Sequence, residues 1–409
     1  MTKLDREATE DTDRALRTQG EVEAHIRAIC FKTGPPTLIG TELEWTLHHS
    51  SAPEAPLDPD HLGHVLGRHA PATLGRGHPP DPLPAGGTLT IEPGGQLEIS
   101  SAPATSTAAL HAAVTADLDH LTALLSAGGL RLGEDGIDRH RSPRRLLGTP
   151  RYTAMERAFD THGPHGRVMM CSTAGLQVCL DAGTPAELPV RWAAALALGP
   201  PMVALFANSA RHAGRNTGLA SARMAAWWGM DPRLTHPPVG PAADPAGAWV
   251  RYAMAAPLLC VRRDDGCWDP PPGVTLADWA GGALPQQLTT SDVEYHLSLL
   301  FPPVRPHGYL EVRYLDAQPG ERWIAPVALF AALFGDPDTT GAALELARPV
   351  AGRWRSAYRN GLRDPALRRT ATALAELATD RLDLPPDLST DVIETVHRRL
   401  HHATVTDQT

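Results

Sequence analysis

Two short segments that concentrate glutamate on strand-like sequence constrain this chain most. The first, residues 88–101, reads TLTIEPGGQLEISS and places Glu92 and Glu98 on either side of a Gly94-Gly95 pair. Glycine adopts backbone angles that other residues avoid, so the chain can bend sharply there and bring polar groups close to a ligand. The segment therefore predicts a tight turn within a strand-like run, flanked by two carboxylates.

The second acidic segment lies upstream, at residues 40–45, and reads GTELEW. Successive side chains of a strand point to opposite faces, so Glu42 and Glu44 share one face while Leu43 and Trp45 take the other. The carboxylates of the two segments would repel one another unless cations lay among them. Hard divalent metals take oxygen ligands, so the pattern predicts a metal-binding acidic face.

The composition describes an ordinary globular chain. With 409 residues it can form a large core, as one big domain or two. The hydrophobic fraction of 42% and charged fraction of 20% are typical of such proteins. A net charge of −9 argues against a nucleic-acid or anionic-membrane surface as the partner. A polyphosphate substrate would need local arginine and bound metal to overcome that field.

The cysteines and the apolar runs predict a cytoplasmic protein. The five cysteines contain no CxxC pair and no zinc spacing, which favours a reducing compartment. They are Cys30, Cys171, Cys179, Cys260 and Cys267. No basic-then-apolar leader opens the sequence. The most apolar run, 192–207, is interrupted by Gly-Pro-Pro and is too short to span a bilayer.

The first half of the chain alternates predicted helices and strands. A helix is expected at 21–31 and the first strand at 37–47. Residues 50–86 are rich in Pro, Gly and His and predict a long loop with at most one helical turn. A helix follows at 105–126, ended by a Gly-Gly pair, and a shorter helix opens at 151–155.

The second half continues with a third strand at 168–181, on which Gln177, Cys179 and Asp181 share a face. An apolar helix, or a helix pair bent at its prolines, is expected at 192–206. Residues 231–290 predict a loop-dominated insertion and a candidate lid.

A helix then begins at a Ser291 cap, and a last strand at 309–315 places Glu311 and Arg313 on one face. From residue 322 onward the chain is predicted to be helical, with a final helix at 389–401 that begins at a Ser-Thr-Asp cap. The predicted domains are a tail and helix (1–36), a catalytic sheet domain (37–320) and C-terminal helices on the same domain (321–409).

Two groups of histidines offer a weaker metal hypothesis. His61, His64, His69 and His78 fall in the long loop, where no fixed ligand geometry is expected. His397 and His401 lie four residues apart on the last helix, where a solvated basic face is the simpler interpretation.

The motif set resembles a known family. It consists of Gly-Thr-Glu-Leu-Glu at 40–44, Ile-Glu-Pro-Gly-Gly-Gln-Leu-Glu-Ile-Ser at 91–100, Arg-Tyr-x-x-Met at 151–155, a Thr-to-Asp strand at 173–181 that contains Gln177, Phe-Ala-Asn-Ser at 206–209 followed by Ser-Ala-Arg-Met at 221–224, and Glu-x-Arg at 311–313. These blocks are similar to glutamate–cysteine ligases of the plant and bacterial type. In particular they resemble the actinobacterial branch, which makes γ-glutamylcysteine for ergothioneine biosynthesis.

The resemblance implies an α+β fold: a glutamine-synthetase-like antiparallel sheet with an acidic metal-binding face and helices packed on the other face. It implies ATP and two or more Mg²⁺ ions, with small-molecule partners (ATP, L-glutamate and L-cysteine). The implied metal ligands are Glu42, Glu44, Glu92, Glu98, Gln177 and Glu311. Arg313 and Gln177 are placed at the ATP phosphates, and Arg313 and Glu42 are the catalytic candidates. The implied substrate-binding residues are Arg223, which holds the carboxylate of the amino-acid substrate, with Tyr152, Arg151, Trp227 and Asn208.

The implied reaction has two steps. ATP phosphorylates the γ-carboxylate of glutamate, and the amino group of cysteine then displaces phosphate. The sequence contains no GxxxxGK[ST] motif, so carboxylate-bound metals take the place of a phosphate-cradling loop. The sequence departs from the pattern of the plant-type members at 174–177 and at Trp227-Trp228. These departures concern the specificity for the amine substrate. The alternatives are a ligase of the same fold that uses another amine, a metal-dependent hydrolase and a catalytically silent binding protein.

Overall fold

A six-stranded sheet forms the centre of the computed structural model, which describes residues 13–75, 79–240, 243–264 and 266–405. The strand order is β3-β4-β1-β6-β10-β9, and all five neighbouring pairs are antiparallel. The strands are β1 (Ile39–Trp45), β3 (Thr88–Ile91), β4 (Leu97–Ser100), β6 (Gly175–Leu180), β9 (Val304–Pro306) and β10 (Leu310–Asp316). The predicted antiparallel sheet is therefore present.

The turn between β3 and β4 uses both of its glycines. The backbone N–H of Glu92 donates to Gln96 and that of Gly95 donates to Glu92, each over 2.8 Å. Gly95 has a φ of 92°, which L side chains rarely adopt. A Cβ on Gly94 would lie 2.1 Å from the carbonyl oxygen of Cys171. The glycine pair thus permits the turn and lets it pack against the neighbouring backbone.

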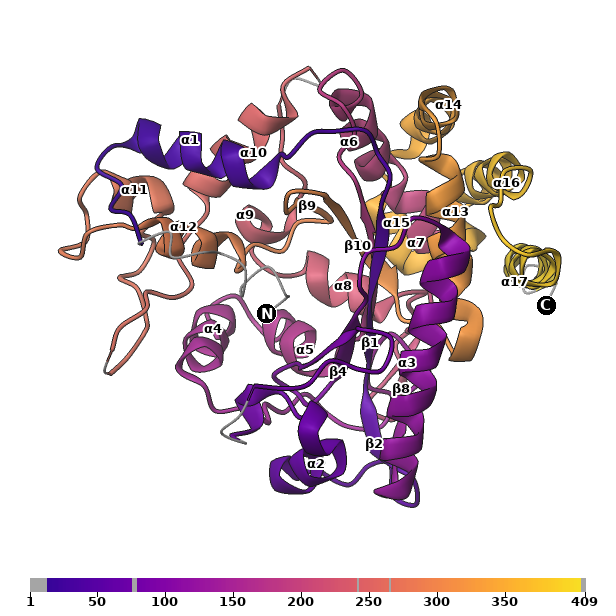
Figure 1. Ribbon diagram of the computed structural model, residues 1–409, viewed down its shortest axis with the longest axis horizontal. Coiled ribbons are helices and arrows are strands. Elements are labelled where there is room, and N and C mark those ends of the chain that lie inside the picture. The colour runs from indigo at the N-terminus through magenta and orange to yellow at the C-terminus, as the bar shows by residue number, and fades with distance from the viewer. Residues whose placement is uncertain (1–12, 76–78, 241–242, 265, 406–409) are drawn as a thin grey trace.

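One face of the sheet is apolar and covered by helices, on the right in Figure 1. Leu43, Val178 and Val312 lie at 2% exposure or less, and the buried Tyr314 hydroxyl donates to the carbonyl of Ala195 over 2.9 Å. The helices on this side are α3 (Thr107–Ala127), α6 (Leu188–Ala197), α7 (Gly199–Phe206), α13 (Ile324–Leu333), α14 (Pro337–Ala347), α15 (Trp354–Asn360), α16 (Pro365–Thr379) and α17 (Pro386–Val405). The prediction that helices pack on the face opposite the acids is confirmed.

A second group of helices stands on the acidic side, on the left in Figure 1, and was not predicted there. These are α1 (Gln19–Cys30), α4 (Pro150–Asp160), α5 (His165–Ser172), α8 (Ala222–Trp228), α9 (Pro232–Thr235), α10 (Pro245–Ala255), α11 (Leu276–Ala280) and α12 (Thr290–Leu297). Three of them, α9, α10 and α11, come from the stretch expected to be loop-dominated. The acids lie between the sheet and this helical layer.

The remaining elements are short. They are α2 (Pro59–Leu66), β2 (Leu47–His49) paired with β5 (Leu130–Leu132), β7 (Arg211–His212) paired with β8 (Arg215–Asn216), and the 3₁₀ helices η2 (Gly67–His69), η3 (Ala72–Leu74), η4 (Gly320–Trp323), η5 (Arg348–Val350) and η6 (Gly361–Arg363). The segment 50–86 is therefore more helical than predicted, because the Asp58 side chain caps α2. His78, one of the four loop histidines considered as metal ligands, lies outside the described residues.

The prediction of a strand from residue 168 was wrong in its first part. Residues 168–172 belong to α5, and β6 begins only at Gly175. The Thr173 hydroxyl donates to the carbonyl of Met169 over 2.6 Å as the chain turns from helical to extended. Met169 and Met170 are buried by this helix, a packing that strand alternation did not reveal. Cys171 therefore lies on α5 rather than on the strand that carries Cys179.

Two predicted helix starts also shift. A capping box between Thr289 and Asp292 begins α12, so the N-cap lies two residues before the expected Ser291. The last helix begins at Pro386 rather than at residue 389, and the Ser389 hydroxyl instead donates to the carbonyl of Leu384. The apolar pair α6 and α7 is bent by 43°, as its prolines predicted.

The core is continuous across the predicted domain boundaries. Buried residues of one cluster extend from Val22 and Ile26 on α1 to Val392 and Val396 on α17. The division at 36/37 and 320/321 stays a prediction. All five cysteines are free thiols. Among the described helices, none alone is long and apolar enough to cross a membrane; α6 and α7 meet those two criteria only as a bent pair.

Candidate active site

The polar side chains of the acidic face form three rows that run across neighbouring strands. By strand register these rows are Thr90–Glu98–Glu44, Ser100–Glu42–Gln177 and Gly40–Cys179–Glu311–Arg305. Glu92 follows at the β3–β4 turn. The register thus gathers the predicted carboxylates and Gln177 on one face, as the strand alternation required.

The carboxylates of this face repel one another. Burial raises the pKa of Glu42 well above its ordinary value, and the charges of Glu98 and Glu311 raise it further. Burial and Glu98 raise the pKa of Glu92 to about 8, and burial and Glu44 raise that of Glu98 to about 7. Hydroxyls compensate little: Thr90 Oγ1 donates to Glu98 over 2.8 Å. Such a cluster favours a bound cation.

Glu311 differs from the other acids because it is paired. Arg305 Nε donates to Glu311 Oε2 over 2.5 Å, and Nη2 donates to Oε1 over 2.9 Å. Arg313 Nε lies 3.6 Å from the same Oε1. Burial alone would raise the pKa of Glu311, but Arg305 and Arg313 outweigh it and lower that pKa. Arg305 was not predicted as a site residue, because it lies among prolines where no strand alternation is visible.

A β-bulge orients Arg313. The register of β10 against β6 shifts between Val312 and Leu315, so two residues of β10 oppose Gln177. Arg313 Nε donates to Gln177 Oε1 over 3.2 Å. The Gln177 amide in turn lies 3.4 Å from Glu44, whose other oxygen accepts the Gly175 N–H over 2.5 Å. Gln177 therefore connects the predicted phosphate-binding arginine to the acidic row.

Trp227 lies between two predicted ligand-binding arginines. The guanidinium carbon of Arg223 is 5.0 Å from the Trp227 ring and that of Arg313 is 5.4 Å from it. The indole N–H donates to the carbonyl of Phe301 over 2.6 Å, which fixes the ring. The tryptophan holds both cations by cation–π contact and sets their separation.

Arg223 is fully buried at the start of α8. Its Nη2 donates to the carbonyl of Arg313 over 2.9 Å, while its Nε has no hydrogen-bond partner among the described residues. Burial lowers the pKa of Arg223, and Glu44 and Asp316 oppose that shift. A Cβ on Gly175 would lie 2.4 Å from Nη2, so a glycine is required there. The orphaned Nε leaves a donor available to an anionic ligand.

Asn208 is committed to the framework. Its side-chain nitrogen donates to the carbonyls of Glu134 and Ala317 over 2.7 and 2.8 Å. Its backbone N–H donates to the buried carboxylate of Asp316, which also accepts from the hydroxyls of Ser209 and Ser221. Asp316 was not predicted as a structural residue, although its carboxylate organises the turn before α8.

Helix α4 brings Arg151 and Tyr152 towards the Glu92 end of the face. The charge of Glu92, second to burial, raises the pKa of Tyr152. Arg151 donates to the hydroxyl and carbonyl of Ser298 and stacks 4.9 Å from the Tyr295 ring.

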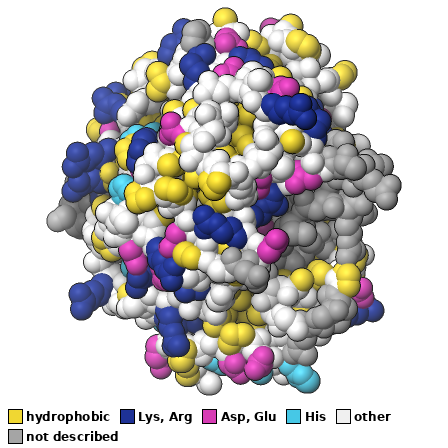
Figure 2. Space-filling view, turned by 90° about the vertical axis from the view of Figure 1, so that its left-hand side faces the viewer, with side chains coloured by type: hydrophobic (Ala, Val, Ile, Leu, Met, Phe, Trp, Pro, Cys, Tyr) yellow, Lys and Arg dark blue, Asp and Glu magenta, His cyan; other side chains and the backbone are white. Residues whose placement is uncertain are grey.

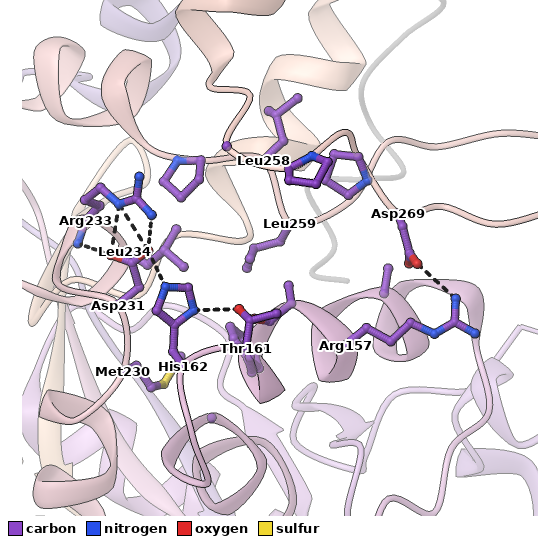
Figure 3. Close-up of a pocket in the computed structure, with 18 of the residues that line it drawn as sticks. Arg157, Thr161, His162, Met230, Asp231, Arg233, Leu234, Leu258, Leu259 and Asp269 are labelled. Atoms are coloured by element: carbon purple, nitrogen blue, oxygen red, sulfur yellow. Dashed lines mark hydrogen bonds and ion pairs between the residues drawn. The ribbon is translucent and has the colours of Figure 1, made fainter.

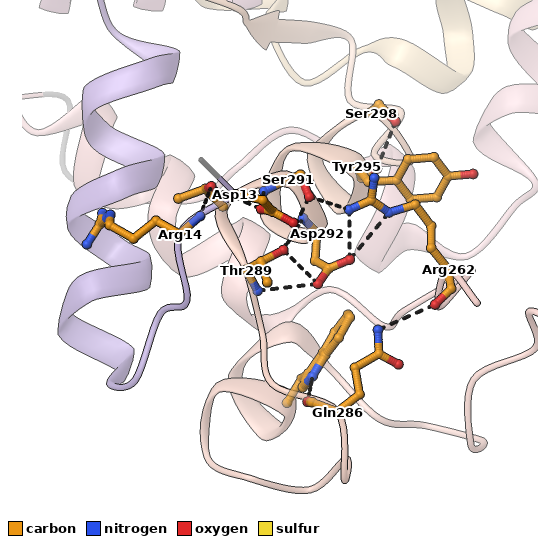
Figure 4. A network of polar contacts seen from close by, with 11 residues as sticks. Asp13, Arg14, Arg262, Gln286, Thr289, Ser291, Asp292, Tyr295 and Ser298 are labelled. Carbon is orange, nitrogen blue, oxygen red and sulfur yellow. Dashed lines mark hydrogen bonds and ion pairs between the residues drawn. The ribbon is translucent and has the colours of Figure 1, made fainter. Parts of the chain in front are cut away.

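Arg262 stacks on the same Tyr295 ring at 5.1 Å and pairs with Asp292 over 2.8 Å. Figure 4 shows this network continuing to Asp13 and Arg14 of the N-terminal segment. The start of α4 is thereby tied to α12 and to the segment before α1.

One cavity lies beside the acidic face rather than on it. Its volume is about 470 Å³, and it opens between α4, α9 and residues 257–259 and 269–273. Figure 3 shows paired charges at its two ends, Arg157 with Asp269 and Arg233 with Asp231. The side of the molecule that bears this helical layer carries arginines interspersed with acids (Figure 2).

The acidic face fits a divalent cation by donor type. Its carboxylates are oxygen ligands in mutual repulsion, which a hard cation would relieve. Within the described ranges, however, no three His, Cys, Asp or Glu side chains are close enough together to enclose a metal ion. The pair formed by Arg305 and Glu311 keeps one of the predicted ligands occupied.

Comparison with known proteins places the chain in a family. Residues 38–408 match the model of glutamate–cysteine ligase family 2. The chain belongs to this family.

Proteins similar in sequence to this chain are also named glutamate–cysteine ligases. The chain is 37% identical over 371 residues to "Glutamate--cysteine ligase EgtA" of Mycolicibacterium smegmatis, covering 88% of this chain and 84% of that protein. It is 34% identical over 411 residues to the EgtA ligase of Mycobacterium tuberculosis, covering 98% and 90%. The chloroplastic glutamate–cysteine ligase of Arabidopsis thaliana is 31% identical over 315 residues, covering 72% and 60%.

The fold agrees with a solved structure, a glutamate–cysteine ligase of Francisella tularensis determined in complex with AMP. The TM-score is 0.51 at 14% sequence identity, covering 92% of this chain and 84% of that one. The predicted family, fold class and ligase class are confirmed, and the hydrolase and silent-binding alternatives are not favoured. The roles of individual site residues stay predictions.

Proposed function

We propose that this protein joins the γ-carboxylate of L-glutamate to the amino group of L-cysteine at the acidic face of the sheet, at the expense of ATP. The observation that carries the proposal is the set of facing carboxylates with raised pKa values, bordered by Arg313 and Arg223. Clustered acids beside arginines suit a substrate that arrives as a metal–polyphosphate complex.

Glu42, Glu98 and Glu311 are the first candidates to hold Mg²⁺, with Glu44, Glu92 and Gln177 next. When bound, Mg²⁺ would neutralise charge on the phosphates and orient the transferred group. The proposal of two or more ions is supported by the spread of acids over several rows of the sheet.

Arg313 is proposed to bind the transferred phosphoryl group. Its bidentate fork suits phosphate, and its contacts to Gln177 and to the Trp227 ring fix its position. Arg223 is proposed to bind the α-carboxylate of glutamate, with the orphaned Nε as the available donor.

Arg151 and Tyr152 at the start of α4, with Trp227, are proposed to border the amino-acid sites. Arg151 is held by Ser298 and Tyr295, so its position depends on α12. Asn208 is proposed to act through the framework, since its side-chain nitrogen is already committed.

The proposed chemistry needs no side-chain nucleophile. The γ-carboxylate oxygen of glutamate attacks the terminal phosphorus of ATP, and ADP leaves. The cysteine amine then attacks the acyl carbon, phosphate leaves with the bonding electron pair, and the amine releases one proton. The protein contributes proximity, charge neutralisation and exclusion of water. The product is proposed to feed ergothioneine biosynthesis in the cytoplasm, in line with the EgtA relatives.

The direct test is ADP release with ATP, Mg²⁺ and L-glutamate, with and without L-cysteine and against a panel of other amines. We expect strong release that depends on both amino acids, with γ-glutamylcysteine as the product. Preference for a different amine would keep the fold and the chemistry and overturn the named product. Absence of nucleotide turnover would overturn the proposed function.

A further inference from the structure

Arg305 occupies an unusual position on the acidic face. It lies on β9 directly opposite Glu311, and it makes two hydrogen bonds to that carboxylate, of 2.5 and 2.9 Å. The side chain of Arg305 is 16% exposed and that of Glu311 only 1%. The pair is therefore almost completely removed from water.

A buried ion pair is a costly way to join the edge strand β9 to β10. Removing both charges from water offsets most of their attraction, and apolar side chains of similar volume are often as stable. β9 and β10 are already joined by a regular antiparallel register on either side of the pair. Strand pairing alone does not account for the two charges.

The surroundings point to a different use. The charge of Glu42 acts on Arg305 as well as on Glu311, so the guanidinium lies within the acidic cluster. Both oxygens of Glu311 are engaged by Arg305, and Arg313 approaches one of them at 3.6 Å. In this arrangement each oxygen of Glu311 already accepts a hydrogen bond from Arg305, so a metal ion at Glu311 would compete with the guanidinium.

We propose that Arg305 is a resident counter-cation: it neutralises Glu311 while the metal is absent, and it must release that carboxylate before Glu311 can bind a divalent cation. The inference rests on the proposed metal site. It makes Arg305 a positioning residue that weakens metal binding by the free protein and protects the apo state from the repulsion of Glu42 and Glu311.

The test is a titration of the protein with Mn²⁺ in the absence of nucleotide. The electron paramagnetic resonance signal of free Mn²⁺ reports how much metal is bound and gives the dissociation constant. The Arg305→Met variant should bind Mn²⁺ at least about tenfold more tightly than the wild-type protein, because Glu311 loses the positive charge that contacts it. Arg305→Lys keeps the charge but loses the bidentate contact, and its affinity should fall between those of Arg305→Met and the wild-type protein. The control is Arg353→Met, which removes a half-exposed arginine from its pair with the buried Asp364 among the C-terminal helices and should leave Mn²⁺ affinity unchanged.

A purely structural role predicts the opposite pattern. Arg305→Met would then lower the melting temperature with unchanged or weaker Mn²⁺ binding, and that result would overturn the proposal. Glu42→Gln separates this failure from failure of the metal site. If Glu42→Gln weakens Mn²⁺ binding while Arg305→Met fails to tighten it, only the role of Arg305 is wrong. If neither substitution changes binding, the metal site and the role of Arg305 both fall.

Discussion

Strand β10 carries buried acids near its two ends, and their surroundings are opposite. Near the start, Glu311 is paired with Arg305, but it lies on a face where the unpaired carboxylates of Glu42 and Glu98 repel one another. At the end, the Asp316 carboxylate accepts from the Asn208 backbone and from the hydroxyls of Ser209 and Ser221, over 2.7 to 2.8 Å.

The difference separates two uses of a buried carboxylate. A carboxylate with all its donors in place stabilises the fold, because breaking its network leaves several polar groups unsatisfied. Carboxylates that face one another destabilise the empty protein and become favourable only with a cation among them. Asp316 is of the first kind and Glu42 of the second. Each of the following predictions tests this contrast.

The largest effect is expected for Glu42→Gln. Turnover should fall about 10²–10³-fold, because one group that neutralises phosphate charge through the metal is lost. Folding should be nearly intact, since the substitution removes a repulsive charge. Steady-state ADP release measures turnover, and thermal melting measures the stability of the fold. Full activity in this variant would show that the acidic face is not the site.

Asp316→Ala should show the reverse order of effects. We expect a loss of about 3 kcal/mol in the free energy of unfolding, because two hydroxyls and a backbone N–H lose their acceptor and the buried Arg223 loses a nearby negative charge. Urea denaturation measures it. Asp58→Ala, at the exposed N-cap of α2, is the control and should cost about 1 kcal/mol. Equal losses in the free energy of unfolding for the two variants would show that the Asp316 network does not stabilise the fold more than an ordinary helix cap.

The pH dependence of the metal-free protein tests the repulsion. The folded state holds protons on Glu92 and Glu98, whose pKa values are raised from 4.5 to about 8 and about 7, while the unfolded chain has lost them. Their contribution to stability is therefore present at low pH and is lost as pH rises through that range. In the presence of a chelator, the melting temperature of Glu98→Gln should fall less between pH 5 and pH 8 than that of the wild-type protein, on the order of a few degrees. Identical slopes would contradict the repulsion.

The smallest effect is expected for Asn208→Ala. Two hydrogen bonds to backbone carbonyls are lost, so the free energy of unfolding should fall by about 1–2 kcal/mol. The KM for glutamate should be unchanged if the side chain acts only through the framework. A large rise in that KM, with stability retained, would restore Asn208 as a direct substrate ligand.

The sequence predicted the features that depend on alternation and on turn residues. Glu42, Gln177 and Glu311 reach one face because strand periodicity places them there, and the Gly94-Gly95 turn follows from backbone freedom. The position of a helical layer over the acids was not predicted, and its helices α9, α10 and α11 were missed because Pro-rich and Gly-rich sequence between 231 and 290 conceals short helices.

Features that depend on tertiary partners were not visible either. Arg305 pairs with Glu311 through a strand of three residues that contains a proline, too short to show a period. Asp316 finds its donors on a turn more than 90 residues away along the chain. The bulge at Arg313 and Tyr314 arises from pairing with β6, which no local pattern records.

The most direct test of the central claim is a crystal structure with Mn²⁺, a non-hydrolysable ATP analogue and L-glutamate, with metal located by anomalous scattering. We expect Mn²⁺ on the sheet, bound by oxygens of Glu42, Glu98 or Glu311, with the nucleotide phosphates beside Arg313. Nucleotide and metal bound elsewhere, with the acidic face empty, would contradict it.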